Sequence, residues 1–197
     1  MSRTIVENAF QFACQHGIPE YVSLMIQDRN KFMQNQNAFF YKEPEFLSLM
    51  DPGYSENKAI RIASSNGHVK VVKILLDDPR VDPSAKDNEA IRCASKYGRE
   101  EVVKILLNDP RVDPSANDNE PIRQASKYGY EEVVTILLND PRVDPSANDN
   151  EAIRNASKYG YGYKEIVKIL LDDPRVDPSA SDNDAIRCAS EFGHEEV

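Results

Sequence analysis

The hydrophobic pattern of residues 88–118 predicts two short helices joined by a tight turn. In the first segment apolar residues recur every three or four positions, which places them on one helical face; they are Ala90, Ile91, Ala94 and Tyr97. Gly98 can adopt the left-handed conformation that ends a short helix. The second segment opens with acidic residues and carries a wide apolar face, made by Val102, Val103, Ile105, Leu106 and Leu107.

The residues that flank these segments indicate where each helix begins and ends. Asn88 is suited to cap the first helix, and Glu89 is favoured by the positive end of its dipole. The second helix should end before Pro110, because the residue that precedes a proline is disfavoured in helical conformation. Residues 111–115 then predict an extended stretch and a turn, called the finger turn below, with Val112 as its apolar anchor.

The same pattern recurs along most of the chain. A five-residue word that starts with Asn and ends with Ile-Arg begins at Asn57, Asn88, Asn119, Asn150 and Asn183. The steps are 31, 31, 31 and 33 residues; the longer step comes from an extra Gly-Tyr within residues 161–163, where a turn tolerates length. Two helices this short cannot bury their apolar faces alone, so stacking against copies must create the core. We therefore predict an all-α solenoid of stacked helix–turn–helix repeats with short finger turns.

These repeats resemble the ankyrin repeat. Residues 63–68 match the family's pair of small residues followed by Gly-His, and residues 71–76 match its Val-Val-x-Leu-Leu-Leu second helix. Residues 120–123 stand where the Thr-Pro-Leu-His opening belongs and keep its proline, and residues 80–84 replace the Gly-Ala-Asp-Val-Asn tail. The resemblance covers nearly the whole chain. It implies a curved array that binds another protein through its finger tips and the concave side of its first helices.

The chain departs from the ankyrin pattern at defined positions. Arg replaces the opening His in all five clear copies, and Glu or Lys replaces the opening Thr except at Asp184. The hydrogen bonds of those family residues must therefore be remade. The unit is also about two residues shorter than the usual ankyrin repeat. Its Asp-Pro-Arg-Val-Asp-Pro-Ser segment resembles ankyrin arrays encoded by giant DNA viruses and some protists.

The recurring word divides the chain into segments. We expect a divergent first repeat at residues 1–28, an aromatic-rich insertion or cap at 29–56, and an incomplete sixth repeat at 183–197. Between them, residues 57–182 should form four ankyrin-type repeats, at 57–87, 88–118, 119–149 and 150–182. The insertion could be a partner-binding arm, but we favour a cap with a short helix over residues 45–50, because arrays require caps. Ile186 and Ala189 should present an apolar face, so we expect a fragment of a longer chain or a covered edge.

Composition and charge narrow the possible partners. The formal net charge of −9 and the pI of about 4.9 argue against a nucleic-acid-binding surface, which relies on clustered Lys and Arg. Three widely spaced cysteines favour reduced thiols over a disulfide framework. The chain shows neither a signal peptide nor an apolar run of membrane-spanning length. We expect a monomer in the cytoplasm or the nucleus, with a protein as its partner and no contact with a membrane.

Side chains near the ends of the first helices are the candidate partner-binding residues. Six of them form repeated Lys-Tyr pairs, and two occupy a position that varies within an otherwise repetitive unit; they are Lys96, Tyr97, Lys127, Tyr128, Lys158 and Tyr159, together with Gln124 and Asn155. The tyrosines could equally pack between repeats, since Tyr is amphipathic and serves both roles.

The arginine that closes each recurring word forms a second repeated feature, called the Arg ladder below (Arg61, Arg92, Arg123, Arg154 and Arg187). An acidic partner could bind these arginines. We favour a structural role, in which they pair with Asp and Asn of neighbouring turns, because the planar guanidinium suits a fixed hydrogen-bond geometry.

The sequence lacks the arrangements typical of catalytic, cofactor-binding or metal sites. His16, His68 and His194 fall in separate repeats and are not expected to meet. Residues 113–119 faintly resemble a calcium loop but lack its central Gly and closing Glu. We therefore predict a protein–protein interaction scaffold or adaptor without a cofactor. The first alternative is a structural spacer for an effector domain outside this chain, and an enzyme is the least favoured one.

Overall fold

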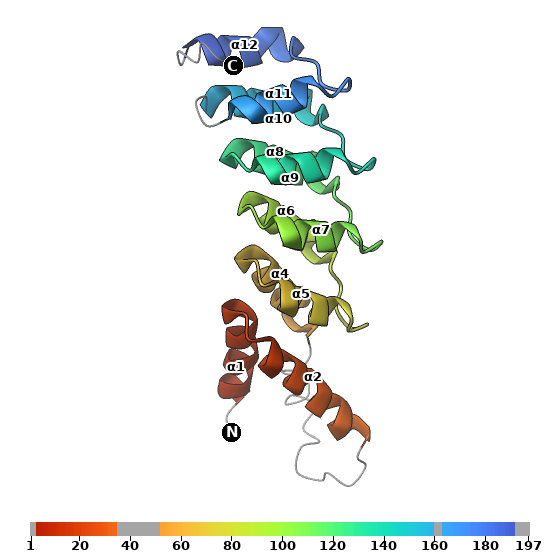
Figure 1. The fold of residues 1–197 in the computed structure, drawn as a ribbon. Coiled ribbons are helices and arrows are strands. Elements are labelled where there is room, and N and C mark those ends of the chain that lie inside the picture. The colour runs from red at the N-terminus through yellow and green to blue at the C-terminus, as the bar shows by residue number, and fades with distance from the viewer. Residues whose placement is uncertain (1–2, 35–51, 160–162, 192–197) are drawn as a thin grey trace. The chain divides into compact units, whose positions relative to one another are not determined.

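The computed structural model describes residues 3–34, 52–159 and 163–191. Within these residues every regular element is an α-helix, as Figure 1 shows, so the predicted all-α class is confirmed. The chain divides into two compact units, Met1–Ala90 and Ile91–Val197, and the boundary falls inside one helix. The helix expected over residues 45–50 and most of the aromatic-rich insertion lie outside the described residues.

The first unit contains two helical hairpins that pack side by side. Its helices are α1 (Arg3–His16), α2 (Pro19–Gln34), α4 (Tyr54–Asn66) and α5 (Val69–Leu76), and α6 (Ala85–Lys96) begins in it. α1 packs on α2 and α4, and α2 packs on α5, so corresponding helices of the two hairpins are neighbours. Phe10, Val22, Ile60 and Leu75 are buried in this unit. α2 continues to Gln34, beyond the end that we expect for a divergent first repeat.

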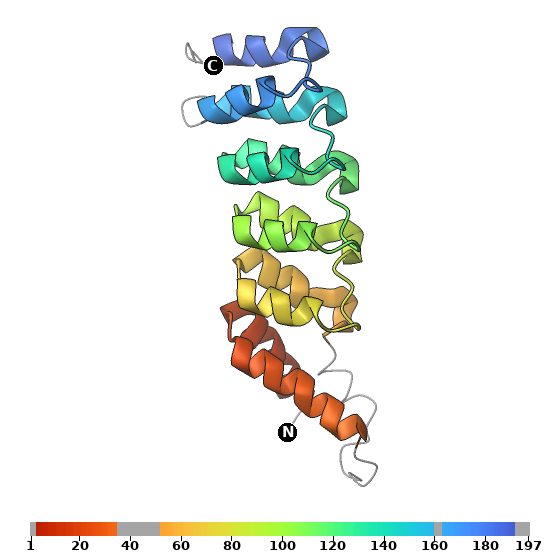
Figure 2. The same cartoon turned by 45° about the vertical axis from the view of Figure 1, so that its right-hand side comes forward.

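The second unit is built from the same kind of helical hairpin. It contains α7 (Glu100–Leu107), α8 (Ala116–Tyr128), α9 (Glu131–Leu138), α10 (Ala147–Tyr159), α11 (Lys164–Leu171) and α12 (Ala180–Glu191). The helices that carry the recurring word, α4, α6, α8, α10 and α12, are called first helices, and α5, α7, α9 and α11 are called second helices. α8, α10 and α12 pack in order, as do α7, α9 and α11, and Figure 2 shows these hairpins in chain order.

Burial in the second unit follows most of the predicted apolar pattern. Ile91, Val103 and Leu106 are fully buried, and Val112 is buried as the anchor of its finger turn. Tyr97, which the pattern assigns to the same face as Ile91, is instead 44% exposed. The equivalent Tyr128 is the last residue of α8 and is likewise 42% exposed, so the apolar face is only partly covered at this end of the first helices.

A left-handed turn opens every first helix from α4 to α12. Its three residues have positive φ; in α8 they are Asn117, Asp118 and Asn119, with φ of 53°, 55° and 59°. Asn and Asp enter this region more readily than most other residues with a Cβ. The right-handed helix therefore starts after Asn119, and Asn88 holds the same place in α6 with φ of 58°.

The asparagine that ends this turn fastens the finger turn of its own repeat. Oδ1 of Asn119 accepts a hydrogen bond from the backbone N–H of Asp144 at 2.7 Å, and Asn150 does the same for Asp177 at 2.8 Å. An N-cap has an extended backbone and accepts from an N–H in the first turn of its own helix. The N-cap role expected for this asparagine is therefore wrong, because the left-handed backbone points its side chain elsewhere.

Arginine side chains connect consecutive finger turns within the second unit. Nη1 of Arg142 donates to the carbonyl oxygen of Val112 at 2.9 Å, and Nη2 donates to that of Leu107 at 3.0 Å. Arg142 also bonds both carboxylate oxygens of Asp140, at 2.9 and 2.6 Å. These hydrogen bonds lower the pKa of Asp140, against a smaller opposing effect of desolvation. A finger turn is thus held rigidly by side-chain and backbone contacts.

Acid should destabilise these repeats. Asp109, Asp140 and Asp173 each have a pKa below the ordinary value, because the arginine two residues later donates hydrogen bonds to the carboxylate. Since the folded-state pKa is the lower one, their contribution to stability is complete above the unfolded-state pKa of about 3.9 and is lost as the pH falls through the folded-state pKa. We expect the midpoint of thermal unfolding, followed by circular dichroism, to fall between about pH 5 and about pH 2.

The matched comparison for this pH effect is the double variant D140N/D173N. This variant lacks two of the three carboxylates whose protonation would destabilise the folded state. Its thermal unfolding midpoint should therefore fall less steeply as the pH is lowered. An equally steep decrease in the variant and the parent chain would contradict the assignment.

Candidate interaction surface

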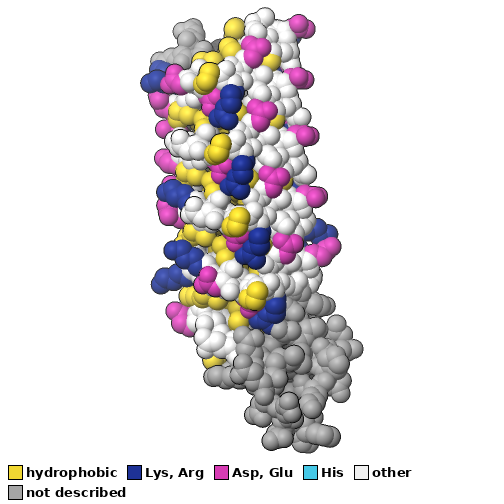
Figure 3. Space-filling view, turned by 90° about the vertical axis from the view of Figure 1, so that its right-hand side faces the viewer, with side chains coloured by type: hydrophobic (Ala, Val, Ile, Leu, Met, Phe, Trp, Pro, Cys, Tyr) yellow, Lys and Arg dark blue, Asp and Glu magenta, His cyan; other side chains and the backbone are white. Residues whose placement is uncertain are grey.

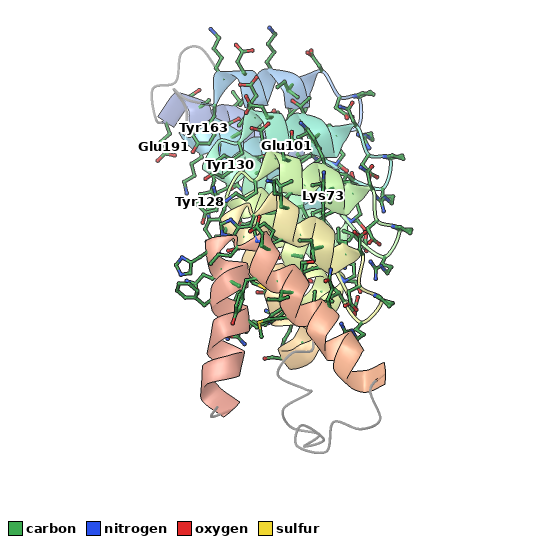
Figure 4. All side chains as sticks on the ribbon, turned by 60° about the horizontal axis from the view of Figure 1, so that its bottom comes forward. Lys73, Glu101, Tyr128, Tyr130, Tyr163 and Glu191 are labelled. Carbon is green, nitrogen blue, oxygen red and sulfur yellow. The ribbon has the colours of Figure 1, made fainter. Side chains whose placement is uncertain are left out.

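The predicted Lys-Tyr pairs lie where the first helices end and turn into the second helices. Lys96 is the last residue of α6 with Tyr97 directly after it, and Lys127 and Tyr128 close α8. These four residues are called the Lys–Tyr surface below. Cations are favoured at this end of a helix, where the dipole is negative. In Figure 4, Tyr128 lies with Tyr130 and Tyr163 on the side of the repeats away from the finger turns.

The geometry of the Lys–Tyr surface couples neighbouring repeats. Nζ of Lys96 lies 5.6 Å from the ring centroid of Tyr97 and 5.9 Å from that of Tyr128, one repeat later. Nζ of Lys127 lies 5.8 Å from the Tyr128 ring. All three distances are within cation–π range. Tyr97 and Tyr128 are nevertheless 44% and 42% exposed, so a large part of each side chain stands at the surface.

The third predicted pair continues this position in α10. Lys158 is exposed near the end of that helix. Tyr159 is its last residue, and the side chain of Tyr159 lies outside the described part of the structure.

The two variable positions lie on the first helices but face a polar network. Nε2 of Gln124 donates to Glu120 at 3.5 Å, and Nδ2 of Asn155 donates to Glu151 at 3.3 Å. Desolvation raises the pKa of Glu151, but hydrogen bonds from Arg123, Asn148 and Asn155 outweigh it, so the pKa is lowered overall. Gln124 and Asn155 are half-buried, whereas Tyr97 and Tyr128 are exposed.

The Arg ladder joins each repeat to the acidic residue of the following one. Arg61 pairs with Glu89 at 2.6 Å in the first unit, and in the second unit Arg92 pairs with Glu120 at 2.7 Å. The later pairs are Arg123 with Glu151 and Arg154 with Asp184. The structural role is therefore as predicted, and the expected partners, Asp and Asn of neighbouring turns, are found in part: the side-chain partner is a glutamate in three of these four pairs and an aspartate in the last.

The correct partner has a visible signal in the sequence. An acidic residue follows the Asn of the recurring word at Glu89, Glu120, Glu151 and Asp184, and we interpret it from sequence as a response to the helix dipole. In its own turn, Arg123 donates only to backbone carbonyls, those of Asp118 at 2.9 Å and Asn117 at 2.8 Å. The arginine of the recurring word therefore bonds both the left-handed turn of its own repeat and the acidic residue of the next repeat, and the second bond fixes the register between the two.

Comparison with protein families decides to which family the chain belongs. A family model described as "Ankyrin repeats (3 copies)" matches residues 40–118 and residues 60–149, which together span more than half of the 197 residues. The chain belongs to the ankyrin repeat family. A search of curated proteins returned no match to this chain. Ankyrin repeats are in general protein–protein interaction modules, and the family is typically non-catalytic.

An aromatic side chain at the start of a second ankyrin helix covers the glycine of the preceding repeat. A Cβ added to Gly98 would lie 2.4 Å from the ring of Tyr130, and one added to Gly129 would lie 3.0 Å from the ring of Tyr163. In the first unit His68 covers Gly17 in the same way, and its Nε2 lies 2.6 Å from the carbonyl oxygen of Gln15. Sequence reasoning did not identify these residues; the signal was an aromatic residue after the repeat's glycine.

Cys14 and Asp113 each have a structural environment. Burial raises the pKa of Cys14 to about 12, so this thiol stays protonated as a core residue. Asp113, in the segment that resembles a calcium loop, accepts hydrogen bonds from the backbone and hydroxyl of Ser115. Across residues 3–34, 52–159 and 163–191 we find neither a metal-binding group of three His, Cys, Asp or Glu side chains nor a helix long and apolar enough to span a membrane.

Proposed function

We propose that this ankyrin array is a protein–protein interaction scaffold that engages a partner through the Lys–Tyr surface, with the finger turns as a second contact region. One observation carries the proposal. Tyr97 and Tyr128 are each more than 40% exposed, although a lysine holds each ring at a defined position. Tyrosine is enriched at protein interfaces and among the residues that dominate binding energy.

Order in the free protein supports this role for the Lys–Tyr surface. Binding is weakened by the conformational freedom that side chains lose in the complex, and side chains that are already held lose less. Lys96 contacts two rings from consecutive repeats, which restricts both the cation and Tyr128 before a partner arrives. The surface can therefore bury two tyrosine rings with little further ordering.

The finger turns supply a repeated polar face at the other end of the hairpins. Figure 3, which looks onto their side, shows Lys and Arg side chains recurring beside Asp and Glu side chains. Arg111, Arg142 and Arg175 each pair with an Asp two residues earlier at 2.6 Å and keep 39% of the side chain exposed. Because these arginines are already paired, we assign the finger turns a supporting contribution to affinity and orientation.

The decisive experiment uses affinity capture from the native cell with the parent chain and the double variant Y97A/Y128A. Loss of two interface tyrosines should lower the affinity for a captured partner by about 2 kcal/mol or more, about thirtyfold. Binding of the purified partner by calorimetry measures this change. The folded state of the variant is checked by its circular dichroism spectrum and unfolding midpoint.

The matched control is Tyr21→Ala. Tyr21 lies on α2 of the first unit and is 42% exposed, as Tyr128 is, but it is not part of the Lys–Tyr surface. We expect this control to bind the partner like the parent chain. Full-strength binding by Y97A/Y128A would contradict the proposal and favour a role as a structural spacer.

A further inference from the structure

The charge environment of the Lys–Tyr surface differs from that of the chain as a whole. The chain has a formal net charge of −9. Lys104 and Lys168 on the second helices are neutralised by Glu101 and Glu165 of their own helices. Lys96 and Lys127 face tyrosine rings instead, and within the described residues no carboxylate pairs with either. Two ordered cations are therefore available to anionic groups of a partner.

This cationic position has defined limits along the sequence. It is occupied by lysine in three consecutive repeats, at residues 96, 127 and 158. The corresponding residue is Ser65 in the preceding repeat and Glu191 in the last one. Glu191 is exposed at the end of α12, as Figure 4 shows, and would repel an anionic segment. A short acidic segment matches these limits better than a long polyanion, which the net charge of −9 would also repel.

The spacing of the repeats is matched by an extended segment with two closely spaced carboxylates. Packed helices lie about 8–10 Å apart, which sets the separation of equivalent positions in consecutive repeats. A polyproline II chain rises about 3.1 Å per residue and has three residues per turn, so residues three apart share a face about 9 Å apart. In an α-helix, residues three or four apart are only about 5–6 Å apart, and a comparable separation on one face needs residues seven apart, at about 10 Å. An extended acidic peptide therefore fits the register of Lys96 and Lys127.

We propose that the Lys–Tyr surface binds an extended acidic peptide segment in which two carboxylates, three residues apart, pair with Lys96 and Lys127 while its backbone lies over Tyr97 and Tyr128. This inference rests on the proposed function and specifies the chemistry of its partner. The carboxylates compensate the two lysines, and the tyrosine rings lose exposed apolar area. Solvent-exposed ion pairs each contribute little to the binding free energy. A short acidic peptide should therefore bind weakly, and its affinity should depend strongly on the salt concentration.

The test is an NMR titration of the full chain, labelled with ¹⁵N, because this method measures weak binding and locates it. The probe is a peptide of Gly and Ser residues that carries two Glu residues three positions apart. We expect backbone amide shifts at residues 96–98 and 127–129, with an affinity about tenfold higher than for the same peptide with Gln in place of Glu. The difference should disappear when the ionic strength rises from about 0.01 M to about 1 M, where the Debye length is roughly 3 Å.

Two variants with equal charge change separate a site from a general charge effect. K96Q/K127Q removes the two proposed cations and should abolish the difference between the Glu and Gln peptides. K70Q/K73Q removes two exposed lysines of α5 and should preserve it. Equal responses of both variants, shifts located elsewhere, or an equal affinity for a peptide with adjacent Glu residues would overturn the inference.

The outcome is distinguishable from that of the proposed function. If the Y97A/Y128A variant loses its captured partner while the acidic peptide does not bind to residues 96–98 and 127–129, the scaffold role stands and the acidic-peptide assignment falls. If the peptide binds as expected but the captured partner is unaffected by Y97A/Y128A, the surface is a peptide site and another face of the array holds that partner.

Discussion

Replacement of Gly98 by alanine is expected to destabilise the array by about 2–5 kcal/mol, the largest effect of any substitution considered for this chain. Gly98 has φ of +65°, where a residue with a Cβ costs about 1–2 kcal/mol. The added Cβ would also lie 2.4–2.9 Å from three ring atoms of Tyr130, one repeat later. Because Cγ is among those atoms, the whole ring has to move, which costs a further 1–3 kcal/mol or so.

Two comparisons isolate the steric part of this effect in urea unfolding followed by circular dichroism. In a Tyr130→Ala background, Gly98→Ala should retain only the backbone cost, so the two substitutions should show a coupling energy of about 1–3 kcal/mol. Gly129→Ala has a similar φ of +80° but a more distant ring, that of Tyr163 at 3.0 Å, and should destabilise less. Additive effects of Gly98→Ala and Tyr130→Ala would show that the ring contact contributes nothing.

Replacement of Asn119 by alanine is expected to cost about 2–4 kcal/mol. The substitution removes the acceptor for the backbone N–H of Asp144 and leaves this donor without its partner. It also places a less suited residue at φ of 59°. Because the finger turn of the same repeat loses an anchor, hydrogen exchange of amides near Asp144 should accelerate more than exchange in α8.

The control for this prediction is Asn117→Ala, in the same left-handed turn. Asn117 has φ of 53° but is exposed, and its side chain makes only a 3.2 Å contact with Glu120. It should therefore show the backbone cost alone, about 1 kcal/mol. If the two alanine variants unfold at the same urea concentration, the bond between Asn119 and the finger turn has no measurable role.

Some of the structural features behind these expectations could be predicted from the sequence, and others could not. The helical hairpins were predictable because the apolar positions at Ile91, Val103 and Leu106 repeat with helical spacing and recur in every unit. The glycine stop at Gly98 was predictable because few other residues adopt positive φ without cost. The left-handed turn before each first helix was not predicted, although Asn-Asp-Asn at residues 117–119 contains the residue types that favour it.

The residues of the candidate surface could be named from the sequence, but their contacts and exposure could not. The resemblance to ankyrin repeats, mapped onto the repeated positions, identified Lys96, Tyr97, Lys127 and Tyr128 together with Lys158 and Tyr159. The periodicity assigns Tyr97 to the buried face but does not reveal how far neighbouring elements cover the end of that face, where Tyr97 is 44% exposed. The contacts of Tyr130 with Gly98 and of Arg123 with Glu151 join residues about one repeat apart, so local pattern analysis assigns them other roles.

The sequence by itself determined the repeat, its two helices, the glycine between them and the apolar residues that each copy offers to its neighbours, because all of these depend on interactions over a few residues or on copying. The tertiary structure alone decided the partner of each polar side chain: the finger turn for Asn119, the next repeat's glutamate for Arg123, and two rings for Lys96. Such pairings depend on distances between consecutive repeats, and a hydrogen bond or ion pair forms only when packing brings its two groups within reach.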